Sequence, residues 1–559
     1  MLVCGLATFA SAAPSKSPAP RQPAAKSTKS SPAKPVASKP KPGASKVVAK
    51  TATSKPGGGK GAPAQKPPPA TPVERPEQDT TSTPPEEPRA ATLHDRLMSI
   101  LHDRPLSRAR VGVVVMRASD GVVLFAHNPD RAFNPASNTK MLTTAAAIAM
   151  LGGDYRYRTT LHGAPPDDEG VVKGDITLRG MGDPSLRATD LTLLAERLHG
   201  LGVHRIEGDL IVDSNFHSDG KSHAPELPGG AIIMDRNVLA VHVDPGDAGS
   251  RPRVWVEPGG EFFVVDNKAT TVKGKKSRLK ISASRDGDKL VVSVRGRIAE
   301  TRGEYVDKLR LGDGALIAGW TLRSAFAAFG IELVGTVRPG SLTDGERVLL
   351  AAHDSQPMAD ICKIANKPSN NFVSEIIFKT VGAERYGWPG TLQKGARAVG
   401  EFLNQMGLPS STFRLVNGSG LTHANRITPS ALALLLRRLY FDMGVSADFL
   451  NSLAIGGIDG TIKHRFLGTD AVGLVRAKTG TLSGVSALSG YVGDKEDVLV
   501  FSILVEGFRG RAKNEVRRAQ VRMVTDMLRY LRRGVSPMPS EPAEPAEPPE
   551  DTESDGDPA

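Results

Sequence analysis

The chain has 559 residues, enough for about three or four domains, and a formal net charge of +12. The charge is uneven, because residues 14–73 carry eleven Lys, one Arg and no acidic residue, whereas residues 541–557 carry eight acidic residues and no basic one. Since the basic residues lie in a low-complexity segment without aromatic residues, the composition argues against a nucleic-acid-binding protein, and the few Cys and His argue against a structural zinc site.

The first residues are predicted to be a signal-peptide remnant. Residues 1–13 form a short apolar run that ends in Ala10-Ser-Ala12, a pattern typical of signal cleavage, but they lack a charged start. The true start is therefore expected upstream, or the signal is truncated. Lipidation of Cys4 is disfavoured because no small residue precedes it. Since Cys4 lies in this leader, Cys362 is left without a disulfide partner in the mature chain and is expected to be a small buried residue. No run approaches the ~20 apolar residues of a transmembrane helix.

Two segments are predicted to be disordered. Residues 14–92 consist mostly of Pro, Lys, Ala, Ser and Gly, which bury too little apolar surface to offset the entropy of ordering. A spacer is the favoured role of this linker, with electrostatic adhesion to an anionic surface or polymer as the alternative. Residues 537–559 form a tail rich in Pro and acidic residues.

Order is predicted to begin near Leu93. A helix is expected at 91–101, followed by a hairpin whose strands, 110–116 and 122–126, are rich in β-branched residues. The next stretch, 134–140, predicts a short loop that opens into a helix at 141–150. Ser137 and Lys140 are three residues apart and share one helix face, roughly 5–6 Å apart at Cβ. A partly desolvated Lys can accept a proton from a Ser, and the helix dipole favours the developing negative charge.

Residues 158–344 are predicted to be an inserted region of mixed α and β structure, because motifs of the active-site type resume only after it. Helices are expected at 189–200 and 314–329. Strands are expected at 174–179, 208–213, 238–243, 253–256, 279–283, 289–294 and 331–337.

The remaining ordered segments, 93–157 and 345–536, are predicted to form one discontinuous domain. A helix starts at Met358 and carries residues 367–372, and further helices are expected at 391–406, 428–443 and 512–533. Three consecutive strands with short turns predict an antiparallel meander. Those strands are 474–481, 485–492 and 498–505. The fold class is therefore α+β, an antiparallel sheet flanked by helices, plus a helical subdomain and the large inserted region.

Three motifs follow one another in this framework: Ser137-x-x-Lys140, Ser369-Asn-Asn371 and Lys478-Thr-Gly480. Each is common alone, since Ser-Asn-Asn often caps a helix and Lys-Thr-Gly often ends a strand. In this order, on a helix start, a helix-to-loop segment and a strand of a meander, they resemble the active-site serine penicillin-recognising enzymes, which include D-Ala-D-Ala peptidases and serine β-lactamases. The predicted fold is accordingly β-lactamase/transpeptidase-like.

The 232-residue gap between Ser137 and Ser369 narrows the resemblance. A long insert at this point is similar to the D-alanyl-D-alanine carboxypeptidase/endopeptidase family of the penicillin-binding-protein-4 type, peptidase family S13. Further runs that resemble this family are Gly182-Asp-Pro-Ser-Leu186, Gly208-Asp-Leu-Ile-Val-Asp-Ser214, Asn417-Gly-Ser-Gly-Leu421, Thr428-Pro429 and Ala477-Lys-Thr-Gly-Thr-Leu482. One departure is Asn417, where the family pattern leads us to expect Asp, so the chain lacks a carboxylate near the site.

The resemblance implies three catalytic residues. Ser137 attacks the carbonyl between two D-alanines, Lys140 takes its proton, and Ser369 relays a proton to the leaving amine. Water then releases the acyl-enzyme, whereas a β-lactam leaves Ser137 acylated.

The resemblance also implies the substrate-binding residues. Asn371 positions the substrate amide, and Lys478 and Thr479 bind its terminal carboxylate. The backbone N–H groups of Ser137 and Thr481 form the oxyanion hole, where one donor is typically worth ~3–4 kcal/mol of barrier. No metal or cofactor is expected.

The implied function is hydrolysis of peptidoglycan stem peptides by a periplasmic or secreted enzyme that β-lactams inhibit; a homodimer is left open. One alternative is a serine β-lactamase, which the long insert and the lack of a Glu-x-x-x-Asn-type segment disfavour. The other is a catalytically idle cell-wall-binding protein, which the presence of all three motifs disfavours.

Overall fold

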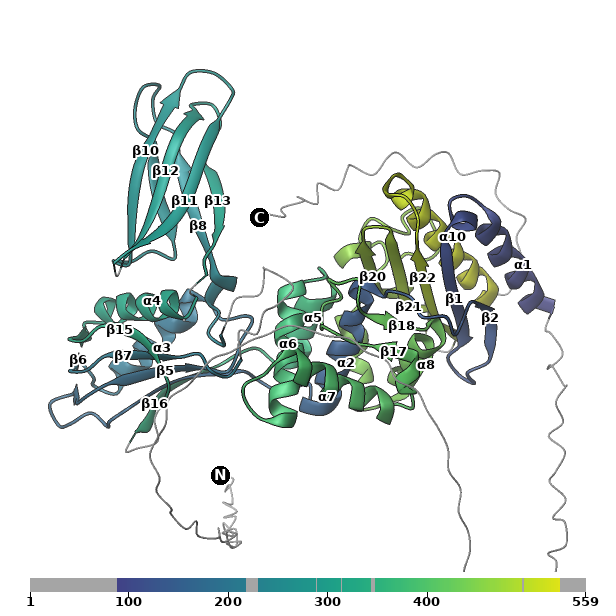
Figure 1. Cartoon of the computed structure of the whole chain (residues 1–559), viewed down its shortest axis with the longest axis horizontal. Helices are drawn as coiled ribbons and strands as arrows, with labels where there is room; N and C mark the ends of the chain where they lie inside the picture. The colour runs from purple at the N-terminus through teal and green to yellow at the C-terminus, as the bar shows by residue number, and fades with distance from the viewer. Residues whose placement is uncertain are drawn as a thin grey trace, which may run out of the picture. The chain divides into compact units, whose positions relative to one another are not determined.

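The structure of the protein is a computed structural model, and it describes residues 88–217, 230–287, 289–312, 314–342, 347–494 and 497–532 (Figure 1). The predicted signal remnant, nearly all of the predicted linker and the predicted acidic tail lie outside these residues. Helix α1, Pro88–His102, begins slightly before the expected position 91. None of the helices in the described residues combines the length and apolar composition that a membrane crossing requires.

The organising element is a six-stranded antiparallel sheet in the order β19-β20-β21-β22-β1-β2. Its strands are β1 Arg110–Arg117, β2 Val123–His127, β19 Ala454–Ile455, β20 Val475–Leu482, β21 Val485–Asp494 and β22 Asp497–Glu506. The predicted hairpin and the predicted meander are both confirmed. Since β1 pairs with β22, the N-terminal hairpin extends the C-terminal meander, and one sheet is built from the two ends of the described chain (Figure 1).

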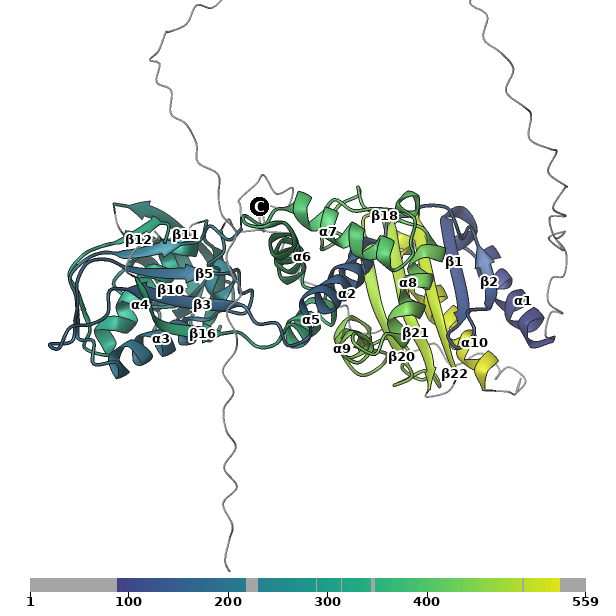
Figure 2. The ribbon, with the colours of Figure 1, turned by 90° about the horizontal axis from the view of Figure 1, so that it is seen from below.

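Helices cover both faces of this sheet, which explains why nine of the ten residues of β22 are buried. On one face lie α1 and α10, Lys513–Leu531 (Figures 1 and 2). Their residues Leu97 and Met523 belong to one apolar cluster with Phe501 of β22. On the other face lies a helical layer whose core includes Met141, Ile376 and Leu436. The layer consists of α2 Thr139–Leu151, α5 Met358–Asn366, α6 Asn371–Tyr386, α7 Leu392–Gln405, α8 Pro429–Phe441 and α9 Ser446–Ser452. The predicted α+β class is confirmed.

The part of the chain between α2 and α5 begins and ends in a five-stranded mixed sheet, in the order β15-β7-β5-β3-β16. The same part of the chain also forms a small parallel sheet in the order β14-β6-β4. Helices α3 and α4 pack together and share one apolar core with these strands. The elements are β3 Arg158–Gly163, β4 Val171–Val172, β5 Ile176–Gly180, α3 Ala188–Gly200, β6 Arg205–Ile206, β7 Leu210–Asp213, α4 Gly314–Ala328, β14 Glu332–Leu333, β15 Val337–Gly340 and β16 Val348–Asp354.

Two three-stranded sheets, β10-β12-β11 and β13-β8-β9, form a separate sandwich between β7 and α4. One apolar cluster that includes Val241, Ala269 and Val292 joins their inner faces. The strands are β8 Val238–Asp244, β9 Arg253–Glu257, β10 Phe263–Val272, β11 Arg278–Asp286, β12 Lys289–Ala299 and β13 Tyr305–Arg310.

Two predicted elements are wrong. The expected strand 331–337 is two short strands, β14 and β15, which join different sheets because Gly335 passes close against the backbone of Gly208 between them. The helix expected from Met358 through residue 372 ends at Asn366, and a new helix, α6, starts at Asn371.

Candidate active site

The Ser137 motif lies in a tight 3-10 turn, Ala136–Asn138, that leads into α2, as the sequence predicted. The side-chain oxygen of Asn134 accepts a hydrogen bond from the Ala136 N–H at 2.7 Å and holds the turn. Ala136 has a φ of +44°, an uncommon conformation for a residue with a side chain, and such strain tends to occur at functional sites. The turn therefore presents Ser137 in a backbone geometry that the surroundings must enforce.

Lys140, one helical turn after Ser137, is fully buried. Its Nζ lies 3.0 Å from the Ser137 Oγ, 2.7 Å from the Asn371 Oδ1 and 2.6 Å from the Ser419 carbonyl oxygen. The last two atoms can only accept hydrogen bonds. A neutral amine has two N–H donors and one lone pair, so these two acceptors use both donors and leave the lone pair for the hydroxyl hydrogen of Ser137.

The charge state of Lys140 fits this geometry. Burial lowers the pKa of Lys140 to about 7, because the ammonium loses its hydration, and the neighbouring Glu375 carboxylate opposes this fall. A substantial fraction of the amine is then neutral near pH 7 and can act as a base.

The second motif occupies the junction between α5 and α6. The side chain of Asn370 caps α6 by accepting a hydrogen bond from the Val373 N–H at 3.0 Å. Ser369, before it, has a φ of +63°. Asn370, the middle residue of the motif, is therefore a helix cap, which is the alternative role that the sequence left open for this motif. The residues on either side of it, Ser369 and Asn371, contact the two buried lysines.

The third motif lies on β20. The Lys478 Nζ, fully buried, donates hydrogen bonds to the Ser369 Oγ at 2.8 Å and to the Thr479 carbonyl at 3.0 Å. Burial lowers the pKa of Lys478 well below its usual range, and the positive charges of Lys140 and Arg465 lower it further. The Thr479 hydroxyl pairs with that of Thr461 at 2.8 Å.

Gly480 brings β20 against the nucleophile turn. A Cβ at this position would lie 2.6 Å from the Pro135 carbonyl oxygen, so only glycine permits this approach. Thr481, half-buried, is the next residue on the strand. The structure thus gathers the predicted residues into two linked contacts, Ser137–Lys140–Asn371 and Ser369–Lys478, with the backbone of β20 alongside.

Sequence reasoning missed a carboxylate behind the base. Glu375, on α6, is buried and accepts hydrogen bonds from the N–H of Gly418 at 3.0 Å, the N–H of Ser419 at 3.1 Å and the Ser419 Oγ at 2.5 Å. These bonds fix the loop whose Ser419 carbonyl holds Lys140. The Gly-Ser-Gly run was a visible signal, but nothing in the sequence linked it to a glutamate more than 40 residues earlier.

Asn417, the departure from the family pattern, supports the same loop. Its Oδ1 accepts hydrogen bonds from the Gly420 N–H at 3.1 Å and from the Asn425 amide at 3.0 Å. Gly420, with a φ of +80°, lies against the Ala136 carbonyl, so the loop also buttresses the nucleophile turn. A carboxylate oxygen could accept the same two hydrogen bonds.

Asn138, next to the nucleophile, anchors the turn to the sheet. It is fully buried, and its amide donates to the Ser489 Oγ on β21 at 2.8 Å. Thr461 and Asn138 were also missed, because both act through partners distant in sequence.

Cys362 is buried with a free thiol, as predicted. Among the described residues, no three His, Cys, Asp or Glu side chains are grouped so as to hold a metal ion.

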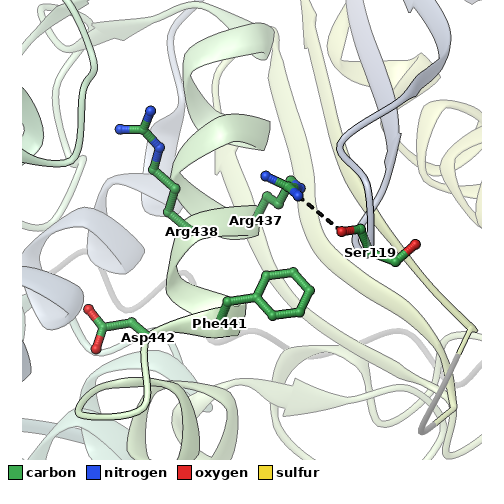
Figure 3. Close-up of a pocket in the computed structure, with 5 residues that line it drawn as sticks. All are labelled: Ser119, Arg437, Arg438, Phe441 and Asp442. Carbon is green, nitrogen blue, oxygen red and sulfur yellow. Dashed lines mark hydrogen bonds between the residues drawn. The ribbon is translucent and has the colours of Figure 1, made fainter.

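A surface pocket of about 390 Å³ lies apart from these motifs, between α8 and the turn of the first hairpin (Figure 3). It is lined by Ser119, Arg437, Arg438, Phe441 and Asp442. Arg437 donates a hydrogen bond to the Ser119 carbonyl at 3.1 Å, which closes one side of the pocket. None of the residues that the motifs identify lines it, and it offers no nucleophile paired with a base. The candidate active site is therefore the convergence of the three motifs.

Comparison with known proteins agrees with this geometry. The family model described as D-Ala-D-Ala carboxypeptidase 3 (S13) matches residues 93–527. A D-alanyl-D-alanine carboxypeptidase from Actinomadura sp. (strain R39) is 31% identical over 451 residues, which cover 76% of this chain and 82% of the relative. The D-alanyl-D-alanine carboxypeptidase DacB of Haemophilus influenzae is 24% identical and is covered to 88%, against 74% of this chain. The crystal structure of penicillin binding protein 4 from the same organism matches with a TM-score of 0.62 and 22% identity, over 77% of this chain and 98% of that one. That protein has also been solved in complex with a β-lactam.

Proposed function

This chain belongs to the D-Ala-D-Ala carboxypeptidase 3 (S13) family, and we propose that it is a serine-type D-Ala-D-Ala carboxypeptidase and DD-endopeptidase that acts on peptidoglycan stem peptides through an acyl-enzyme at Ser137. The observation that carries the proposal is the buried Lys140 amine, 3.0 Å from the Ser137 hydroxyl and with both of its neutral-state donors used elsewhere. We place the enzyme in the cell envelope, periplasmic or secreted, where this substrate lies.

In the proposed acylation, the Ser137 Oγ attacks the carbonyl carbon of the penultimate D-Ala and its proton passes to the Lys140 Nζ. The Ser419 carbonyl and the Asn371 oxygen then accept from the ammonium that forms, so no reorganisation is needed as charge develops. The oxyanion would lie between the backbone N–H groups of Ser137 and Thr481, which the close approach of Gly480 supports.

The C–N bond of the tetrahedral intermediate then breaks, and the leaving amine of the terminal D-Ala takes a proton through the Ser369 hydroxyl. The hydrogen bond from the Lys478 Nζ to the Ser369 Oγ supports this role, since it can stabilise the hydroxyl oxygen while the hydroxyl proton leaves. Lys478 and Thr479 would bind the terminal carboxylate of the substrate, with Thr461 orienting the Thr479 hydroxyl. In the second half-reaction, water gives a proton to the neutral Lys140 amine and attacks the acyl carbon. The bond from that carbon to the Ser137 Oγ then breaks, and the Oγ takes the proton back from Lys140.

The test is labelling with a fluorescent penicillin, with Ser137→Ala as the blank, followed by product analysis on pentapeptide and on cross-linked muropeptides. We expect stable labelling of the native chain, none of Ser137→Ala, and release of D-Ala or cleavage of cross-links. Absence of labelling in the native chain would refute the acyl-enzyme. Rapid turnover of the penicillin would indicate a β-lactamase, and labelling without product would indicate an idle cell-wall-binding protein.

A further inference from the structure

The positive charge of the ordered part of the chain is concentrated in the small β-sandwich. Residues 263–310 contain thirteen Lys and Arg against six Asp and Glu, a net charge of +7 in 48 residues. Residues 74–540 together carry +8, the total of +12 being otherwise due to the two terminal segments. The segment from β10 to β13 therefore has a net charge close to that of residues 74–540, while the whole sandwich, residues 238–310, carries +5.

The strand register places these charges on one face of the β10-β12-β11 sheet. Leu279, Ile281 and Val294 point inward to the core of the sandwich, and the residues that alternate with them point outward. Five outward side chains occupy two adjacent rows across the strands. The first row is Lys268, Arg295 and Lys280, and the second ends in the pair Arg297 and Arg278.

The loop that follows β10 extends this surface. It carries Lys273, Lys275 and Lys276, all exposed, and it begins beside the Arg297–Arg278 row. The Thr301 hydroxyl donates to the Gly274 carbonyl at 3.1 Å, which holds the loop against the end of β12. We call these eight side chains the cationic face: Lys268, Lys273, Lys275, Lys276, Arg278, Lys280, Arg295 and Arg297.

The cationic face is poorly neutralised by the protein itself. Asp266 pairs with Arg295 at 2.8 Å and with Lys268 at 3.5 Å, and both cations remain about half exposed, at 46% and 61%. For Lys280, Arg278 and Arg297 the described residues provide no ion pair. Like charges directly opposite one another on a sheet are destabilising. Binding of an external anion to the cationic face would reduce this repulsion.

The composition of the cationic face favours one kind of binding partner. The aromatic residue of these three strands, Phe263, packs toward the core, so no ring is offered to stack on nucleic-acid bases or to enter a bilayer interface. The Asp266 pairing shows that a carboxylate fits between Arg295 and Lys268. Rows about 7 Å apart on strands about 4.8 Å apart suit several carboxylates at once.

We propose that the cationic face docks the protein onto peptidoglycan through the carboxylates of neighbouring stem peptides. The proposal rests on the proposed function, because it takes the substrate polymer as the occupant. In this arrangement the wall is bound at two places, by the active site through one stem and by the sandwich through several others. Such multivalent contact raises the effective concentration of substrate without altering the catalytic step.

The test uses the full chain with Ser137→Ala, so that binding is measured without cleavage, and sedimentation with purified sacculi as the readout. The variant Lys280→Gln/Arg295→Gln/Arg297→Gln is expected to bind about tenfold more weakly at low salt. The difference should disappear at high ionic strength. The matched control removes three exposed charges from the other part of the structure, Arg509→Gln/Arg511→Gln/Arg518→Gln, and should bind like the parent.

Equal binding of the parent and the cationic-face variant would overturn the proposal, as would binding of the parent to phosphatidylglycerol vesicles or a polyphosphate but not to sacculi. The variant should unfold at the same or a higher temperature, because like-charge repulsion is removed. A second variant, Lys273→Gln/Lys275→Gln/Lys276→Gln, changes only a loop and provides the same test if the first fails to fold. With Ser137 present, penicillin acylation should be equal in all variants, so failure of docking is separable from failure of the proposed function.

Discussion

The buried Glu375 should control both the position and the charge of the proposed base. Replacing it with Gln keeps the size of the side chain but removes its charge and one acceptor oxygen. Because Glu375 accepts three hydrogen bonds from Gly418 and Ser419, an amide group must face at least one N–H that it cannot accept. This mismatch should lower the free energy of unfolding by about 1–3 kcal/mol.

The charge effect can be worked from the contacts. Ser419 lies between the two charges. The Lys140 Nζ lies 2.6 Å from the Ser419 carbonyl oxygen, and the Ser419 N–H donates to the Glu375 carboxylate at 3.1 Å. The separation is therefore roughly 7 Å, and at an effective dielectric constant of about 20 the attraction is about 2 kcal/mol. Since the carboxylate stabilises the ammonium, its loss should lower the pKa of Lys140 from about 7 to roughly 5.5.

The assay is the rate of acylation by a fluorescent penicillin as a function of pH. In the native chain the rate should rise tenfold per pH unit below about 7 and level off above it, because only the neutral amine accepts the Ser137 proton. In Glu375→Gln the midpoint should move to lower pH, while the plateau falls because the loop is less well held. The control is Glu384→Gln, an exposed carboxylate on the same helix, which should leave the midpoint unchanged. An unchanged or higher midpoint in Glu375→Gln would refute the reasoning.

Three further changes test the same framework. Asn417→Asp should keep the fold, since the new carboxylate can accept both existing hydrogen bonds, and its charge should raise the pKa of Lys140, so the acylation midpoint should move above 7. Gly420→Ala should lower the thermal stability by at least about 1 kcal/mol and abolish penicillin labelling, because φ is +80° and the new Cβ would collide with the Ala136 carbonyl. Asn138→Ala should reduce acylation about tenfold without moving its pH midpoint, because the hydrogen bond from the turn to the sheet is lost while the charges stay in place; equal rates would show that the turn is positioned by other contacts.

The parts of the fold that sequence predicted are those with strong local patterns. The hairpin and the meander were recognisable because runs of β-branched residues alternate with turn residues, and the structure pairs them as expected. That β1 pairs with β22 could not be read in this way, since the two strands are almost 400 residues apart. The break between α5 and α6 was missed because the capping residue, Asn370, lies inside a motif whose three letters suit a loop or a helix equally.

The candidate site divides in the same manner. Motif spacing identified Ser137, Lys140 and Lys478, because their chemistry depends on residue type at short range. The supporting partners, Glu375 and Thr461, act through hydrogen bonds between segments that are far apart in sequence. Only the three-dimensional fold reveals that these side chains meet the motif residues.

The charges of the site point to the form of its substrate. Lys140 and Lys478 are both fully buried, and burial lowers the pKa of each; the charge of Lys140 lowers the pKa of Lys478 further, while the Glu375 carboxylate opposes the fall at Lys140. A site with two buried amines and one buried carboxylate favours a ligand that brings its own negative charge, as a peptide ending in D-Ala does. The arriving carboxylate should raise the pKa of both lysines, most strongly that of Lys478, which it contacts in the proposed complex. We therefore expect the pH midpoint of kcat to lie above that of kcat/KM for peptide substrates, because the first reports the complex and the second the free enzyme; coincident midpoints would mean that the substrate carboxylate binds away from these lysines.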